Sequence, residues 1–451
     1  MTRTGSVLAV FAPAALVTAV CWATVRPAAG VQGTATARPE DRPVPAVVGR
    51  AVGQSGCSSV GCHGAPGSDV FRTGPTPTSW ASSALVWAAA DPHRRAYAVL
   101  DGELATKMMI ALTGEASPGA PKVKATSEAR CLACHTNPTL ATTTNDPHAV
   151  SLRTEGVSCE ACHGNASGWL QSHTGFTTQI RPAGYNAGGM SRLYDLGERA
   201  LACAGCHVGA PAENGLPLRD MNHDMIAAGH PRLNFDFATY QFMLPKHWFE
   251  RDRTKPESRP DPDFEARAWL IGRVAHAEAA CKLTTDRAKR AAPWPEFAEY
   301  SCVACHHRIG DPGAAYPAPT SRPLGSVPWQ PVWPVDRMVP SLGVVQSATR
   351  GPRPNPGVGD AAAKAAKDLS MLRASGLGSA REWFTKALPA GEWDRDLTEQ
   401  VYHAAAALER AKATRDPAAF AAAADLLRLP RGTVQFNLKP GAADAVRTLV
   451  R

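Results

Sequence analysis

The sequence predicts a mainly α-helical protein with much irregular chain, and three observations support this class. Glycine and proline are abundant, with 38 of each among 451 residues, and they interrupt the chain often before residue 310. Strict alternation of apolar and polar residues, which is typical of strands, is weak in that region. From Asp360 onward the composition changes to alanine, lysine, glutamate and leucine, which form helices readily.

Individual helices follow from the spacing of apolar side chains. Trp269, Val274 and Cys281 recur at helical intervals and predict a helix within residues 261–283. Residues 311–359 are dense in proline, so we interpret them as an extended linker or a strap across the surface, packed through its tryptophans. Three more helices, expected to form a small antiparallel bundle within residues 360–451, lie at 360–376, 394–416 and 417–430.

A repeated cysteine pattern carries the chemistry. The motif CxxCH occurs four times, at residues 131–135, 159–163, 203–207 and 302–306. Its two thiols add to the vinyl groups of haem, and its histidine becomes the proximal ligand of the iron. A zinc site needs paired cysteine knuckles and a disulfide needs only the thiols, so neither explains the histidine. We therefore predict c-type haems bound by Cys131, Cys134, Cys159, Cys162, Cys203, Cys206, Cys302 and Cys305, with the proximal ligands His135, His163, His207 and His306.

The stretch "GCSSVGCHG" at residues 56–64 resembles this motif but has four residues between its cysteines. A longer loop still brings Cys57, Cys62 and His63 to one porphyrin edge, so we interpret it as a fifth haem site. The alternative is a Cys57–Cys62 disulfide beside an unrelated histidine. With five haems, ten of the twelve cysteines are used, and the pentahaem domain spans residues 51–310.

Nine histidines remain as candidates for the distal face of these haems. His93 and His148 each follow Asp-Pro, which places proline in the first turn of a helix. His173 follows the third motif by ten residues, and His223 and His230 are seven apart, on one face of a helix. We predict these five as distal iron ligands. The others are expected to be hydrogen-bonding, haem-edge or surface groups: His247, His276, His307 and His403.

The stretch "GVSCEACHGNASGWLQSH" at residues 156–173 carries a known pattern. It resembles the multihaem cytochromes c of the cytochrome c-554 family, whose haem stacking is shared with hydroxylamine oxidoreductase and the pentahaem nitrite reductases. The resemblance covers about residues 55–210 and implies a chain wrapped round stacked haems. It does not extend to the last CxxCH motif, the proline-rich segment or the helical bundle.

The resemblance also implies which histidines share a haem, namely His93 with His163, His148 with His63 and His173 with His207. The second haem of that family is five-coordinate, and its counterpart here is the haem of His135. His223 and His230 remain for the haems of His135 and His306, in either order.

Covalent haem attachment implies export, and the N-terminus agrees. Arg3 precedes an apolar stretch at residues 7–25, which predicts a signal peptide within residues 1–30 or an uncleaved anchor that would associate with the membrane. Residues 31–50 are polar and proline-rich, as in a disordered leader. We expect a periplasmic protein.

These features predict an exported cytochrome with five haems that transfers electrons between other redox proteins or to a respiratory complex. The formal charge of +8 is largely offset by haem propionates, and the scattered basic residues do not indicate nucleic acid binding. The alternative is an oxidoreductase that acts on a small nitrogen or sulfur compound at one five-coordinate haem. Its pocket would be lined by His247, His307, Arg232 or Asp236.

Overall fold

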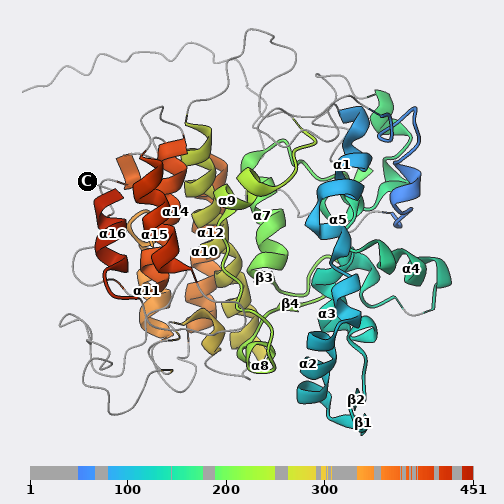
Figure 1. Ribbon diagram of the computed structural model, residues 1–451, viewed down its shortest axis with the longest axis horizontal. Coiled ribbons are helices and arrows are strands. Elements are labelled where there is room, and N and C mark those ends of the chain that lie inside the picture. The colour runs from blue at the N-terminus through green and yellow to red at the C-terminus, as the bar shows by residue number, and fades with distance from the viewer. Residues whose placement is uncertain are drawn as a thin grey trace, which may run out of the picture.

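The computed structural model places the haem motifs beside a helical bundle (Figure 1). It describes residues 49–66, 80–143, 145–175, 188–248, 263–290, 296–300, 333–349, 357–375, 395–410, 416–428 and 439–449, with positions 302, 306, 377, 382–384, 388 and 393 between them. The predicted signal peptide and most of the leader lie outside these residues. Within them, no helix is both long and apolar enough to cross a membrane.

The chain up to residue 248 consists of short helices, 3-10 turns and irregular segments, which confirms the predicted class. Its α-helices are α1 (Ser83–Ala90), α2 (Glu103–Thr113), α3 (Ala129–His135), α4 (Pro147–Leu152), α5 (Cys159–His163), α7 (Leu196–His207), α8 (His223–Ala227) and α9 (Phe237–Met243). Two antiparallel pairs of very short strands join them: β1 (Glu115–Ser117) with β2 (Ala120–Pro121), and β3 (Gly209–Ala210) with β4 (Arg219–Asp220).

Three haem motifs have the same local structure. Helices α3, α5 and α7 each end on the histidine of a CxxCH motif. The two cysteines are therefore separated by about one helical turn and lie on one face. Side-chain caps start two of these helices, since Glu128 accepts from the Arg130 N–H at 3.2 Å and Asp195 from the Glu198 N–H at 2.9 Å.

The second half of the chain forms a bundle around one long helix, shown in yellow to red in Figure 1. Its helices are α10 (Phe264–Arg290), α11 (Ser341–Ala348), α12 (Val358–Ser375), α14 (Arg395–Arg410), α15 (Pro417–Leu427) and α16 (Ala442–Leu449). Helix α10 packs against α12 and α14 on one side and against α7 and α9 on the other. Its residues Trp269, Leu270 and Val274 are at most 1% exposed. The bundle is thus built onto the helix that carries the fourth motif.

Two expectations from the sequence differ from this arrangement. The largest apolar cluster runs from Ala200 to Val446, so its core crosses the division expected at residue 310. The proline-rich segment is not extended throughout, because its described part contains α11, whose Leu342 and Val345 are fully buried. The expected packing through tryptophan is present, since the Trp333 ring centre lies 5.8 Å from that of Trp269.

A buried ion pair joins the bundle to the haem-bearing helix. Arg373 of α12 donates from Nε to Glu278 of α10 at 2.8 Å and from a terminal nitrogen to Glu198 of α7 at 3.1 Å. We expect Arg373→Met to lower the free energy of unfolding by about 3 kcal/mol, because it removes one cationic partner of the buried Glu278 carboxylate. The loss is no larger because Lys282 still pairs with that carboxylate. Chemical denaturation measures this. The exposed pair of Arg428 and Asp425 is the control, and Arg428→Met should cost less than about 1 kcal/mol.

Candidate haem sites

Five pairs of histidine rings face one another, and each pair joins a motif histidine to a histidine outside the motifs. Their ring centres are 6.2 Å apart for His63 and His173, 6.1 Å for His207 and His93, 6.3 Å for His135 and His230, 6.4 Å for His163 and His247, and 6.2 Å for His306 and His223. Each of the five predicted motif histidines is therefore matched.

These separations suit a metal ion between the rings. A metal–imidazole bond is about 2.0–2.1 Å long, and the ring centre lies about 1.1 Å behind the nitrogen, so two imidazoles on opposite sides of one metal have centres about 6.2 Å apart. Aromatic rings in direct contact have centres anywhere from about 4.5 to 7 Å apart, so direct contact alone gives no reason for five pairs to repeat one spacing. The ring geometry therefore fits a haem iron at all five pairs.

The second nitrogen of several of these rings is already hydrogen-bonded. Nδ1 lies 3.0 Å from the Ser83 hydroxyl in His63, 2.9 Å from Asp91 Oδ1 in His93, 2.6 Å from the Ala96 carbonyl in His135, 2.5 Å from the Leu170 carbonyl in His173 and 2.8 Å from the Pro231 carbonyl in His230. Carbonyl partners require a proton on Nδ1, which leaves the Nε2 lone pair free for a metal. These contacts set both the tautomer and the ring direction.

Burial keeps most of the motif rings neutral, as a metal ligand must be. Desolvation lowers the pKa of His163 to about 3 and that of His207 to about 4, each aided by the charge of a neighbouring histidine. Desolvation also lowers the pKa of His135 and His247. His93 is different, because its hydrogen bond with Asp91 raises its pKa. A buried carboxylate at this position makes the imidazole a stronger electron donor to a metal.

Thiols from different motifs lie next to one another. A hydrogen bond from Cys159 holds the pKa of Cys57 below its usual value, and one from Cys134 lowers the pKa of Cys206 to about 6. The first motif therefore adjoins the third, and the second adjoins the fourth. Cys57 and Cys62 are free thiols, so the disulfide that the sequence left open between them is not present. Cys305 and His307 lie outside the described residues.

Two glutamates, one within and one just before the third motif, hold the backbone that precedes the stretched first motif. Glu160 lies between the cysteines of the third motif and accepts the backbone N–H groups of Val52 at 3.0 Å and Gly53 at 2.8 Å. Glu155 accepts the next N–H, from Gln54, at 2.9 Å. Gly53 has φ of +84°, and a Cβ there would lie 2.5 Å from the Leu152 side chain, so this close approach requires glycine. These contacts bring Cys57 to Cys159.

The partners of three motif histidines differ from those implied by the family resemblance. His93 faces His207 instead of His163, and His173 faces His63 instead of His207. His148, predicted as a distal ligand, is exposed at the start of α4 and contacts no other ring among the described residues. Its helix has the same Asp-Pro start as the turn of His93, but most residues of α4 are exposed.

His247 faces His163, for which the resemblance implied His93, and so replaces His148 as the fifth candidate distal ligand. It lies four residues after α9, and its ring faces that of His163. The sequence predicts a hydrogen-bonding or haem-edge group at this position, and no helix start or repeat spacing singles it out as a ligand. The packing of Trp248 under the Arg199 guanidinium, 5.4 Å from the ring centre, holds this segment against α7. Those contacts are tertiary, so they leave no local signal in the sequence.

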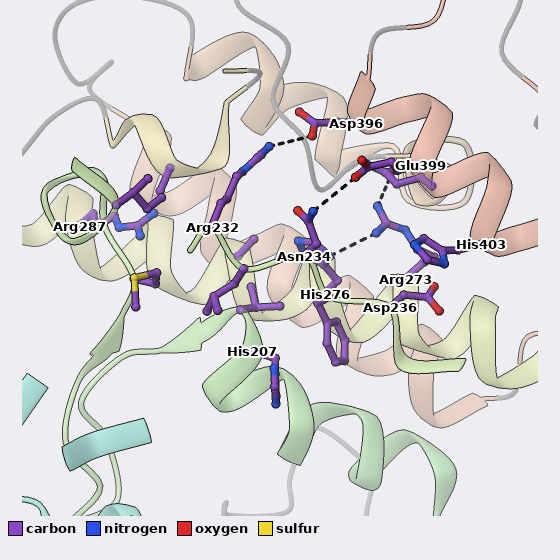
Figure 2. A pocket seen from close by; sticks show the side chains of 18 residues that line it. His207, Arg232, Asn234, Asp236, Arg273, His276, Arg287, Asp396, Glu399 and His403 are labelled. Carbon is purple, nitrogen blue, oxygen red and sulfur yellow. Dashed lines mark hydrogen bonds and ion pairs between the residues drawn. The ribbon is translucent and has the colours of Figure 1, made fainter. Parts of the chain in front are cut away.

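A cavity of about 100 Å³ lies between α7, α10, α14 and residues 232–236 (Figure 2). It contains Arg232 and Asp236, which the enzyme alternative assigned to a substrate pocket. Arg273 is 3% exposed and donates to two neutral acceptors, the Trp333 carbonyl at 2.9 Å and the Gln400 side chain at 2.9 Å; burial lowers its pKa to about 10.

This cavity borders one haem motif through His207. The ring of His207 faces His93 on its other side. These two imidazoles would hold a haem iron between them, and both of its axial positions would then be filled from this chain. His403, expected at the surface, borders the cavity and lies 3.2 Å from the Thr239 hydroxyl.

Comparison with known proteins finds one family match. Residues 82–164 match the family model described as cytochrome c554 and c-prime. No curated protein and no solved structure matches the chain. The matched range contains the second and third motifs and also His93 and His148. The relation to hydroxylamine oxidoreductase stays a prediction. Over residues 82–164, the chain is therefore similar to the cytochrome c554 and c-prime family.

Proposed function

We propose that this protein is an exported electron carrier with five c-type haems, each bound between two histidines. The observation that carries this proposal is the set of five facing ring pairs at 6.1–6.4 Å. Bound haem supplies one-electron chemistry, while the chain fixes the axial imidazoles and shields the rings. Paired imidazoles favour low reduction potentials.

The ring pairs favour a carrier over an enzyme. Catalysis at haem needs one iron with an open position for substrate. The expected candidate is the haem of His135, whose family counterpart is five-coordinate. In this protein His230 faces His135 at 6.3 Å, with its Nδ1 held by the Pro231 carbonyl at 2.8 Å. That arrangement supports six-coordination at the one site where the alternative function would be placed.

Close contact between motifs supports rapid electron exchange. Cys57 adjoins Cys159, and Cys134 adjoins Cys206. Burial and the nearby charges of Cys203 and Cys206 raise the pKa of Cys162, so the third motif also adjoins the fourth. Haems attached at neighbouring thiols lie close to one another, which is what electron transfer along a chain of haems requires. The partners that we propose are other periplasmic redox proteins or a respiratory complex, with the N-terminal segment as signal or anchor.

Carbon monoxide tests this function. It binds ferrous haem only at a vacant or weakly held axial position. We expect the reduced, purified protein to show no spectral change on its addition, because every iron has two imidazoles. Stoichiometric binding at one haem, together with turnover of hydroxylamine or nitrite, would instead establish the oxidoreductase. An oxidised spectrum with only low-spin haem is the matching expectation.

A further inference from the structure

The fifth haem motif, which is the CxxCH sequence at residues 302–306, lies outside the range that matches the cytochrome c554 family. The segment that supplies its facing histidine also serves a second motif. His223 faces His306 at 6.2 Å, and His230, seven residues later, faces His135 at 6.3 Å. One short stretch therefore serves two haem motifs that are far apart in the sequence.

Residues 222–230 are folded tightly enough to fix both rings. Asn222 starts α8 by accepting the Met225 N–H at 3.1 Å, and the Met225 carbonyl accepts the His230 N–H at 3.0 Å. The Met225 side chain is 4% exposed and belongs to the apolar cluster that contains Leu132 of α3. This cluster anchors the segment beside the motif of His135.

A buried carboxylate ties the other end of the segment to the fifth motif. One oxygen of Glu296, Oε1, accepts the His223 N–H at 2.7 Å and the Ala298 N–H at 2.9 Å. Glu296 is 6% exposed and starts the 3-10 turn Phe297–Glu299, which leads to Cys302. The Phe297 ring also packs edge-on against His223, with ring centres 5.8 Å apart. Both contacts position His223 relative to the turn before the motif.

The helical bundle also contacts residues 222–232 and the turn before the fifth motif. Arg232, two residues after His230, pairs with Asp396 of α14 at 2.8 Å, as Figure 2 shows, and its other nitrogen donates to the Tyr300 carbonyl. The Tyr300 hydroxyl donates to the Thr349 carbonyl at 2.7 Å, at the end of α11. The approach to the fifth motif is thus fastened to residues 222–232 and to the bundle.

We propose that residues 222–230 are a two-haem ligand bridge, which delivers His223 to the haem of His306 and His230 to the haem of His135, and that Glu296 is the positioning residue that holds His223 in place. This inference rests on the proposed function, because it assumes bis-histidine haems. It assigns the C-terminal bundle a role: to support a fifth haem next to the haem of His135.

Glu296→Ala tests the positioning role in the full-length protein with all its haems. The change removes the acceptor of two partly buried N–H groups and releases His223 from the turn, so one of the five haems should become high-spin and bind one carbon monoxide per protein. Added imidazole should return that haem to low spin. Glu296→Gln keeps an oxygen at the same position, so it should stay low-spin. Loss of low spin in the glutamine variant as well would assign the effect to charge and overturn positioning through Oε1.

Combined variants identify the haem. His223→Ala should open one haem, and adding Glu296→Ala to it should open no further one. His230→Ala should open a different haem, so that Glu296→Ala with His230→Ala opens two. Asp416, which accepts two backbone N–H groups at the start of α15, is the control, and Asp416→Ala should leave all haems low-spin.

The outcomes separate the two proposals. A wild-type protein that lacks five low-spin haems contradicts the proposed function. If the wild type has five low-spin haems, two results overturn the ligand bridge alone. One is an unchanged spectrum in Glu296→Ala, and the other is that His223→Ala and His230→Ala open the same haem.

Discussion

Replacing His247 with alanine should convert one low-spin haem to a high-spin haem. Its ring centre lies 6.4 Å from that of His163, and no other described histidine outside the motifs faces that ring. Losing the imidazole leaves the iron with one strong axial ligand, so the electron paramagnetic resonance spectrum should gain a high-spin ferric signal from one haem. The reduced variant should then bind one carbon monoxide per protein.

His148→Ala is the matched control, since the sequence assigned this histidine the role that we now give to His247. The His148 side chain is exposed, and its helix is capped by Asp146 at 3.0 Å without help from the ring. Its variant should keep the wild-type spectrum. The opposite result, a spin change in His148→Ala and none in His247→Ala, would contradict the assignment and restore the pairing implied by the family resemblance.

Intact-mass analysis of the wild-type protein should show five covalent haems. The haem of His63 depends on the stretched motif. Cys57 of this motif is buried beside Cys159, and the backbone that precedes the motif is held by Glu160. Cys57→Ala should leave that haem with a single thioether or lose it, because only Cys62 remains to attach it, while the other four stay attached.

Cys281→Ala serves as the control for this experiment. Cys281 is also fully buried, but it lies in α10 and belongs to no motif, so the variant should keep five haems. A wild-type mass with four haems and a disulfide between Cys57 and Cys62 would show that the stretched motif binds no haem.

Features that depend on residues close in sequence were predictable. A CxxCH motif places two thiols and a histidine within two turns of a helix, so its chemistry is present in five consecutive residues, and the helices that end on His135, His163 and His207 have that geometry. The bundle helices α12, α14 and α15 likewise follow from local composition and apolar spacing. Helix α16 and helix α11 inside the proline-rich segment were missed.

The distal ligands depend on the tertiary structure. His93 and His148 have the same Asp-Pro start and the same local capping, yet only His93 faces a motif histidine. His247 has no local signature at all and reaches His163 through the packing of its segment on α7. The sequence by itself predicted which residues would attach haem and showed that spare histidines exist. Which histidine meets which motif was decided by the tertiary structure, because an axial pair is a contact between segments whose approach depends on all the packing between them.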